Sequence, residues 1–410
     1  MNIWCISKYA SPAKYAKVPA RLFYFCQEWQ KLGHEVHLFT SDSNHLAQFP
    51  RSERTHHQEN IEGVWVHWFK TKKYKTTASV ARIVSWFDFE RRLFGFKHRQ
   101  LNPPDVVLVS SLSILSIVYG YYLKRKYGAT LVFEIRDIWP LTMTEEGGFS
   151  KYHPLTLFIG AIEKFGYQVA DLIVGTMPGL NKHVKNVIHK DFNFHCAPLG
   201  FHPDNYKAAS LDNNAFVGRF PENKTIVGYA GSMGITNALE PFIEAIYDLQ
   251  HDARFYFVLV GSGDLRAGFE ERLKECTNVV FLPRIEQSQV KDLLAYCDVL
   301  YLSTNDSKVW EYGQSMNKVV EYMLAAKPII ASYTGYPSMI NEAECGYFLT
   351  PQDGETPKEA IIRALSVIGS MSQAERQVMG ERGKQWIYQH RSYSLLAQQY
   401  LAKIESISNG

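Results

Sequence analysis

The segment from Tyr312 to Ile330 passes from a polar loop through a short helical pattern into an apolar strand. Asn317 is expected to cap the helix, with Lys318 in its first turn. The first N–H groups of a helix lack internal partners and carry partial positive charge, so they stabilise a phosphate. One turn later, the Glu321 carboxylate could accept hydrogen bonds from two sugar hydroxyls. Together these features predict a nucleotide site, whereas an ion pair between Lys318 and Glu321 on a solvated helix is the alternative.

Two glycine turns follow apolar strands in the same half of the chain. The first contains Gly231, Ser232 and Gly234, and the second contains Gly261 and Gly263. Glycine lets a backbone pass close to a ligand, and open α/β sheets bind ligands at the carboxyl ends of their strands. We expect both turns to border the predicted nucleotide, although a plain strand-to-helix turn has the same glycine spacing.

Charged residues end an apolar stretch in the first half, where Glu134, Arg136 and Asp137 follow Val132. Buried charges require partners or a function. A carboxylate beside a guanidinium stays ionised at neutral pH, so Asp137 is expected to bind sugar hydroxyls. Arg136 would offset charge on a phosphate or on Asp137. We predict these two as catalytic residues, and a structural salt bridge between them is the alternative.

The loop after the first strand carries the cations Lys14, Lys17 and Arg21. We expect this loop to lie over a cleft and to contact an acceptor diphosphate or the donor, and solvated surface is the competing interpretation. The chain contains no Asp-x-Asp sequence that would hold a divalent metal against a diphosphate. Helix dipoles and cationic side chains would then stabilise the leaving group without a metal.

Length and composition are typical of a folded protein with two domains. The chain has 410 residues, of which 46% are hydrophobic and 21% charged, and a formal charge of +3. Its six cysteines show no metal-binding or disulfide spacing. The N-terminus does not resemble a signal peptide, and no apolar run is long enough to span a membrane. We expect a cytoplasmic protein.

Apolar strands alternate with helical patterns in both halves, which predicts an α/β fold with two Rossmann-like, doubly wound parallel sheets facing a central cleft. Predicted strands include Asn2–Ser7, Thr130–Glu134, Phe255–Val260 and Ile329–Ser332. The expected organisation is a first domain over 1–200, a linker over 201–224, a second domain over 225–388 and a terminal helix within 389–410.

One motif of this chain resembles that of the retaining GT-B glycosyltransferases of family 4. It consists of Ser315, Asn317, Lys318 and Glu321, followed by Tyr-Met-Leu-Ala-Ala-Lys-Pro. The likeness is strongest to the bacterial O-antigen and capsule branch that includes L-fucosaminyltransferase-like enzymes. The resemblance implies that Glu321, the second Glu of an E-x7-E pair, binds the donor ribose. The first Glu of that pair would fall on Gly313, and Glu311 lies two residues away.

The resemblance also implies that Arg284 lies near the nucleotide base, although a surface arginine is an equal alternative. It implies a GT-B fold with an acceptor-binding domain over 1–200 and a nucleotide-sugar-binding domain over 225–388, whose last helix, about Tyr393–Ile407, returns to the first domain. The expected activity is retaining, metal-independent transfer of a hexosyl or N-acetylhexosaminyl group. The sugar would come from a UDP-sugar, with an N-acetylated deoxy sugar as one candidate, and no cofactor is expected. The acceptor would be a lipid-linked glycan precursor of a surface polysaccharide such as lipopolysaccharide.

Aromatic and basic residues interleave over Val64–Lys75 and Trp86–Arg99. Such segments suit an anionic membrane interface, so we expect peripheral association with the inner face of the cytoplasmic membrane. Core aromatics flanked by solvated lysines are the alternative, and no nucleic-acid module is present. Two other functions stay open: a hydrolysing nucleotide-sugar epimerase, and a non-catalytic nucleotide-sugar-binding partner of a membrane assembly.

Overall fold

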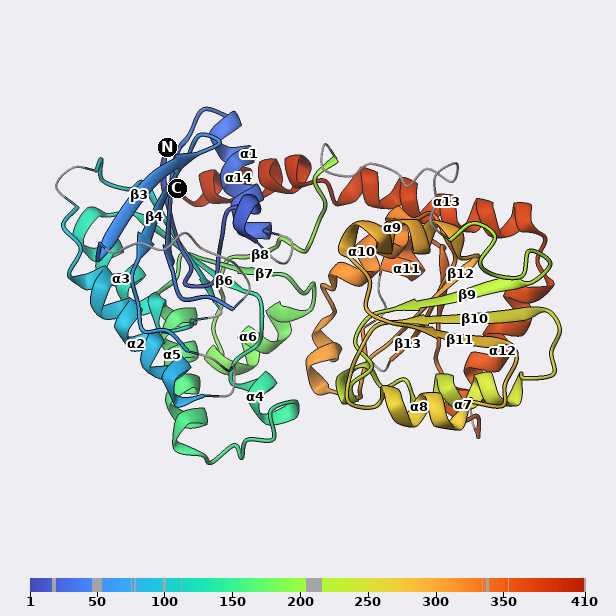
Figure 1. Cartoon of the computed structure of the whole chain (residues 1–410). Helices are drawn as coiled ribbons and strands as arrows, with labels where there is room; N and C mark the ends of the chain where they lie inside the picture. Colours follow the sequence, from blue (N-terminus) through green and yellow to red (C-terminus); the bar gives the residue numbers. More distant parts are fainter. Residues whose placement is uncertain are drawn as a thin grey trace. The chain divides into compact units, whose positions relative to one another are not determined.

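The computed structural model describes residues 1–16, 20–45, 54–74, 76, 79–98, 101–111, 113–203, 216–333, 335–336, 339–352 and 354–408. The chain forms two compact units. Unit 1 contains Met1–His202 and Ser392–Gly410, and unit 2 contains Pro203–Arg391 (Figure 1).

Within its described residues, unit 1 is built on an eight-stranded sheet with the order β3-β4-β2-β1-β5-β6-β7-β8. All neighbouring strands are parallel except β3, which runs antiparallel to β4. The strands are β1 (Asn2–Ile6), β2 (Glu35–Ser41), β3 (His56–Ile61), β4 (Val64–Phe69), β5 (Val106–Ser111), β6 (Thr130–Ile135), β7 (Leu172–Gly175) and β8 (Phe194–Cys196).

Helices cover both faces of this sheet. Helices α1 and α14 pack against each other on one face, and α2, α3 and α5 cover the other (Figure 1). The helices of unit 1 are η1 (Ala13–Tyr15), α1 (Arg21–Lys31), α2 (Val80–Phe94), α3 (Ser116–Tyr127), α4 (Leu141–Glu145), α5 (Pro154–Val169), α6 (Leu180–Ile188) and α14 (Tyr393–Ser408).

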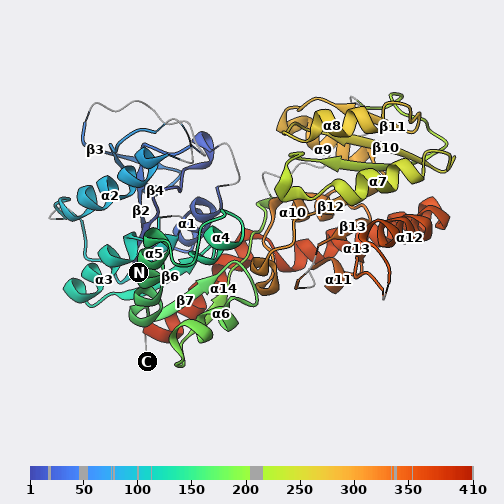
Figure 2. The same cartoon turned by 90° about the horizontal axis from the view of Figure 1, so that it is seen from below.

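The return of α14 to unit 1 has a clear physical basis. Helix α14, drawn in red, lies among the blue and green elements of unit 1 and contacts α1 (Figure 2). Its buried Tyr393 and Tyr400 pack their rings against Phe25 of α1. The Trp29 indole N–H donates to the Ala397 carbonyl at 3.0 Å. Burial of aromatic side chains is strongly favourable, and the buried indole keeps a hydrogen bond. The last helix thus completes the core of unit 1.

Unit 2 holds a parallel six-stranded sheet with the order β11-β10-β9-β12-β13-β14 in its described residues. Its strands are β9 (Thr225–Ala230), β10 (Phe255–Val260), β11 (Val279–Leu282), β12 (Val299–Ser303), β13 (Ile329–Ser332) and β14 (Gly346–Phe348). Its helices are η3 (Ile235–Asn237), α7 (Glu240–Asp248), α8 (Arg266–Arg272), α9 (Gln287–Tyr296), η4 (Lys308–Tyr312), α10 (Asn317–Leu324), α11 (Met339–Glu342), α12 (Pro357–Ser370) and α13 (Gln373–His390).

The predicted α/β class with two parallel sheets is confirmed, and so is the returning terminal helix. The predicted linker over 201–224 includes residues 204–215, which lie outside the described residues. Among the helices that the structure describes, none combines the length and apolarity needed to cross a membrane.

Candidate functional site

The two glycine turns of unit 2 lie against each other at the carboxyl ends of β9 and β10. The Gly231 N–H donates to the Val260 carbonyl at 2.9 Å, and the Met233 N–H donates to the Ser262 carbonyl at 2.9 Å. A Cβ on Gly261, whose φ is +145°, would lie 1.8 Å from the Gly231 carbonyl oxygen. Gly261 therefore serves the close approach of two backbones.

Of the other predicted turn residues, Gly263 packs against backbone, whereas Ser232 and Gly234 are accessible to solvent. A Cβ on Gly263 would lie 2.4 Å from the Met233 carbonyl oxygen, so this glycine too serves backbone contact. Ser232 is exposed, and a Cβ on Gly234 would meet nothing closer than the Ser232 hydroxyl at 3.5 Å. Ser232 and Gly234 thus form the accessible rim of the turns.

Helix α10 begins differently from the prediction. Its N-cap is Met316, in an extended conformation with ψ 133°, and Asn317 is the first helical residue, so the prediction of Asn317 as the cap is wrong. The first bond along the helix joins the Val320 N–H to the Met316 carbonyl at 3.5 Å. The preceding N–H groups have no such bond, as at any helix start, and favour an anion.

Lys318 brings a cation from α10 to the glycine turns. Its ammonium donates to the Tyr229 hydroxyl at 3.3 Å and to the Asn237 Oδ1 at 3.4 Å. A Cβ on Gly231 would lie 2.6 Å from the Lys318 Nζ, so the lysine lies directly against the first turn. Burial lowers the pKa of Lys318 to about 8, and the nearby Glu321 acts in the opposite direction. A desolvated cation of this kind is a strong point charge for a phosphate.

Glu321 lies one turn along α10 and is half-buried, as is Ser315 before the helix. Gly313 ends η4 with a φ of +105°, in a region that residues with a side chain rarely adopt. The backbone therefore favours glycine where the resembled pattern has its first Glu. Glu311 lies exposed within η4.

Arg284 follows β11 and is exposed. Sequence reasoning did not single out Arg266, whose Nη1 donates to the carbonyls of Gly261 at 2.6 Å and Leu282 at 2.9 Å. Arg266 thus fixes the second glycine turn to the end of β11, and only the folded arrangement of these segments reveals this role.

In unit 1, Arg136 and Asp137 follow β6 and are half-buried. Among the described residues, neither side chain forms a hydrogen bond or ion pair, so the alternative of a salt bridge between them is not what the structure contains. Burial lowers the pKa of Arg136, as does the charge of Arg21. Burial raises the pKa of Asp137, although the charges of Arg136 and Arg82 oppose this rise.

A second group of polar residues lies at the carboxyl end of β1 and was not singled out from the sequence. Lys8 is buried, its ammonium donates to the Ser43 carbonyl at 2.8 Å, and burial lowers its pKa to about 7. The Tyr9 hydroxyl accepts from the Arg82 Nε at 3.1 Å and from the Trp86 indole at 2.7 Å. The position of Lys8 directly after a strand was the available signal.

Glu90 of α2 belongs to the same region of unit 1. Its Oε1 accepts from the Ser116 hydroxyl at 2.6 Å, and its Oε2 is buried without a hydrogen-bond partner. Burial raises the pKa of Glu90 to about 8, with Lys8 acting in the opposite direction. A protonated carboxyl at neutral pH is suited to donate a hydrogen bond.

The predicted cationic loop is only partly a loop. Arg21 is the first residue of α1 and is fully buried, with its Nη1 2.8 Å from the Glu134 Oε2 and its Nη2 bonded to the Ala197 carbonyl. The expectation of Arg21 on an open loop is therefore wrong, because its partner Glu134 holds it in the core. Lys14 is exposed in η1 and lies 3.4 Å from Glu59. Lys17 lies outside the described residues.

The described residues bring together no group of three His, Cys, Asp or Glu side chains that could hold a metal ion.

Comparison with protein families matches residues 19–187 to a glycosyl transferase 4-like domain and residues 224–367 to glycosyl transferases group 1. Comparison with curated proteins gives no match.

Comparison with solved structures finds whole-chain similarity. A sucrose-phosphate synthase from Thermosynechococcus elongatus has a TM-score of 0.72 at 15% identity, over 99% of this chain and 98% of that chain. WaaG, a glycosyltransferase involved in lipopolysaccharide biosynthesis, has a TM-score of 0.64 at 14% identity over 100% of both chains. HepE from Anabaena, solved with UDP-glucose, has a TM-score of 0.64 at 14% identity, over 99% of this chain and 100% of that chain. Since each unit matches a glycosyltransferase domain and the fold is shared along the whole chain, this protein is a glycosyltransferase of the GT-B fold.

Proposed function

We propose that this glycosyltransferase transfers a sugar from a UDP-sugar, with an N-acetylated deoxy sugar as one candidate, to a lipid-linked precursor of a bacterial surface polysaccharide. The observation that carries the donor assignment is the position of Lys318, at the start of α10 and against the first glycine turn. The structural likeness to HepE, which was solved with UDP-glucose, supports a uridine nucleotide.

In the proposed reaction, the bond between the sugar C1 and the diphosphate oxygen breaks, and the acceptor hydroxyl oxygen forms the new bond to C1. The leaving UDP gains negative charge, which the first N–H groups of α10 and Lys318 stabilise without a divalent ion. The acceptor proton passes to the leaving phosphate on the same side of the sugar, so the configuration at C1 is retained.

Within unit 2, we assign Glu321 to the ribose hydroxyls, Ser315 and Asn317 to the diphosphate, and Arg284 to the base region. In unit 1, we assign Arg136 and Asp137 to the sugar and to the charge of the reacting groups. Support comes from the half-buried position of these two charged side chains, since neither has a side-chain hydrogen bond or ion pair among the described residues that would compete with a ligand. The exposed Lys14 remains an acceptor-side candidate.

We further propose that unit 1 binds the cytoplasmic face of an anionic membrane through an apolar patch on α2 and α5. The rings of Phe87 and Phe158, which are 51% and 42% exposed, stack at 6.3 Å, and Phe94 and Leu157 are also exposed. Exposed Arg91, whose guanidinium also pairs with Asp88 at 2.8 Å, brings a cation to this patch. Trp86, by contrast, faces the core, so the membrane contact would come from its neighbours on α2.

Turnover of a UDP-sugar with a lipid diphosphate acceptor tests the reaction. Glu321→Ala and Asp137→Asn should each remove measurable transfer, while Lys274→Gln, a surface change in unit 2, should leave it intact. A thermal shift larger for UDP than for GDP and ADP is expected, because a ligand bound only to the folded state raises Tm. Equal shifts for the three would contradict the donor assignment. Release of free sugar or an epimer from labelled donor would indicate an epimerase, and binding without turnover would indicate a non-catalytic partner.

Sedimentation with vesicles tests the membrane contact. The double change Phe87→Ser, Phe158→Ser should reduce binding to vesicles of anionic lipid, and transfer to a water-soluble acceptor should persist. The exposed Tyr388→Ser in unit 2 serves as the control. Unchanged sedimentation of the double variant would rule out this patch.

A further inference from the structure

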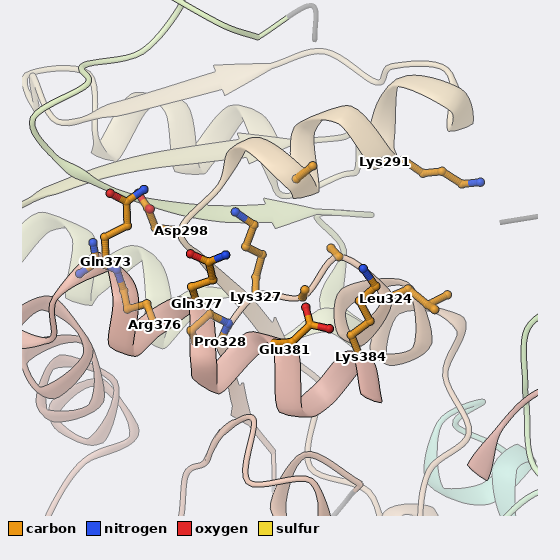
Figure 3. A pocket seen from close by; sticks show the side chains of 13 residues that line it. Lys291, Asp298, Leu324, Lys327, Pro328, Gln373, Arg376, Gln377, Glu381 and Lys384 are labelled. Atoms are coloured by element: carbon orange, nitrogen blue, oxygen red, sulfur yellow. The ribbon is translucent and has the colours of Figure 1, made fainter. Parts of the chain in front are cut away.

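A polar pocket of about 320 Å³ lies in unit 2 at the amino ends of β12 and β13. The glycine turns lie at the carboxyl ends of strands in the same parallel sheet. The pocket and the glycine turns are therefore at opposite ends of the strands. Figure 3 shows side chains from α13 meeting those that precede the two strands. Its charged lining consists of Lys291, Lys327, Arg376, Lys384, Asp298 and Glu381.

The cations of this pocket exceed its available carboxylates. Asp298 already accepts the Ile226 N–H at 2.8 Å with its Oδ2. Lys327 lies between α10 and β13, and its ammonium has no hydrogen bond or ion pair among the described residues. Burial lowers the pKa of Lys327, with the charge of Asp298 acting in the opposite direction. A half-buried lysine without a partner gains more from an anion than a solvated one does.

Arg376 contributes a second incompletely bonded cation. Its Nη1 donates to the Met371 carbonyl at 2.6 Å, while its Nε is buried without a partner. The amides of Gln373 and Gln377, one helical turn apart on α13, line the same side of the pocket (Figure 3). This combination of guanidinium, ammonium and amide groups matches the several acceptor oxygens of a phosphate.

We propose that this pocket binds the phosphate group of a small phosphorylated metabolite, at a site separate from the donor nucleotide. The pocket has room for roughly ten water molecules. This space is larger than a phosphate ion fills and suits a sugar phosphate. Lys327 and Arg376 hold the phosphate, Lys384 adds charge, and the glutamines are available for sugar hydroxyls.

Isothermal titration of the whole chain with glucose 6-phosphate, inorganic phosphate and glucose tests the proposal at constant ionic strength. Glucose 6-phosphate should bind more tightly than inorganic phosphate, and glucose should not bind. Lys327→Met and Lys384→Gln should each weaken binding about tenfold or more, as expected for loss of a charged hydrogen bond. Lys274→Gln removes the same charge from an exposed position in unit 2 and should have no effect.

Two further measurements separate this site from the donor site. Lys318→Met should leave the affinity for glucose 6-phosphate unchanged, and saturating UDP should not displace the sugar phosphate. Displacement by UDP, or equal affinity of wild type and Lys327→Met, would overturn the proposal. Tighter binding of inorganic phosphate than of the ester would show a site for the free ion and would overturn the assignment to a metabolite. Failure of the UDP experiments above would leave the titration result unaffected.

Discussion

The ammonium of Lys318 lies 3.3 Å from the Tyr229 hydroxyl oxygen and 4.5 Å from the centre of the Tyr229 ring. The Tyr229 hydroxyl itself donates to the Ser232 carbonyl at 2.6 Å, so the tyrosine joins the lysine to the first glycine turn. Its ring holds the cation by cation–π attraction. This arrangement places a desolvated positive charge beside the glycine turns, so an anion that binds there would need little rearrangement of the lysine.

Lys318→Met should stabilise unit 2 while it weakens UDP binding. A drop in the pKa of Lys318 to about 8 means that holding the charged form in the fold costs up to about 3 kcal/mol. Because the unfolded chain binds the proton more tightly, this cost is full below pH 8 and disappears as the pH rises toward 10.5. Urea unfolding at pH 7 and pH 10 measures it. A variant that is less stable at pH 7 and binds UDP normally would contradict the assignment.

UDP affinity should decline as the pH rises through about 8, because Lys318 loses its charge there. The bound diphosphate raises the pKa of this lysine, so the affinity begins to fall near the pKa of the free protein and levels off above the higher pKa of the complex. Titration calorimetry between pH 7 and pH 10 measures the profile. Lys318→Met should flatten it, and an identical decline in the variant would assign the effect to another group.

Arg21→Met should destabilise unit 1 by about 3–5 kcal/mol, because it leaves the Glu134 carboxylate buried without its cation. Glu134 would keep the hydrogen bond from the Ser110 hydroxyl, at 2.7 Å. The double change Arg21→Met, Glu134→Gln removes both charges and should recover most of the loss in urea unfolding. If Arg21 instead contacts the acceptor, the single change would lower turnover at unchanged stability.

The His98 ring is expected to make unit 1 sensitive to acid. Its nitrogens lie 3.2 Å from the Tyr127 hydroxyl and 2.6 Å from the Tyr119 hydroxyl, and burial lowers its pKa to about 4. The unfolded chain therefore binds a proton below about pH 6.5 that the folded chain does not, and about 3 kcal/mol of stability is lost as the pH falls to 4.

His98→Gln keeps hydrogen-bonding groups at this position and removes the titration. The free energy of unfolding, measured by urea at pH 4 to 7, should depend less steeply on pH in this variant. His251→Gln changes an exposed histidine and should retain the wild-type slope. Equal slopes in wild type and His98→Gln would show that other groups govern acid stability.

The fold was predictable because the strands are short, apolar and separated by helical patterns. The observed strands β10 and β13 have the predicted bounds, Phe255–Val260 and Ile329–Ser332. The start of α10 was misread because a cap depends on backbone dihedrals, and Met316 is extended where Asn317 is already helical. Residue preference alone does not fix that boundary.

The positions of charged side chains were harder to predict from the sequence than the positions of the strands. Arg21 reads as part of a basic loop until the fold brings it to Glu134, which lies 113 residues away in the chain. The unusual environment of Lys8 likewise follows from the fold, which brings the Ser43 carbonyl and the charge of Arg82 close to its ammonium. Burial and long-range partners determine the role of a charge, and neither follows from local spacing.

Gly313→Glu should lower stability and bring no gain in transfer, although it restores the glutamate of the resembled E-x7-E pattern. At a φ of +105°, a residue with a side chain is strained by about 1–2 kcal/mol, so the new carboxylate would enter only with a change of the loop backbone. Gly313→Ala is the matched control, because it imposes the same strain without a carboxylate. Both variants should show a similar loss of unfolding free energy in urea and a similar kcat/KM. A kcat/KM for Gly313→Glu well above that of Gly313→Ala would mean that the loop adapts and that the missing glutamate limits this enzyme.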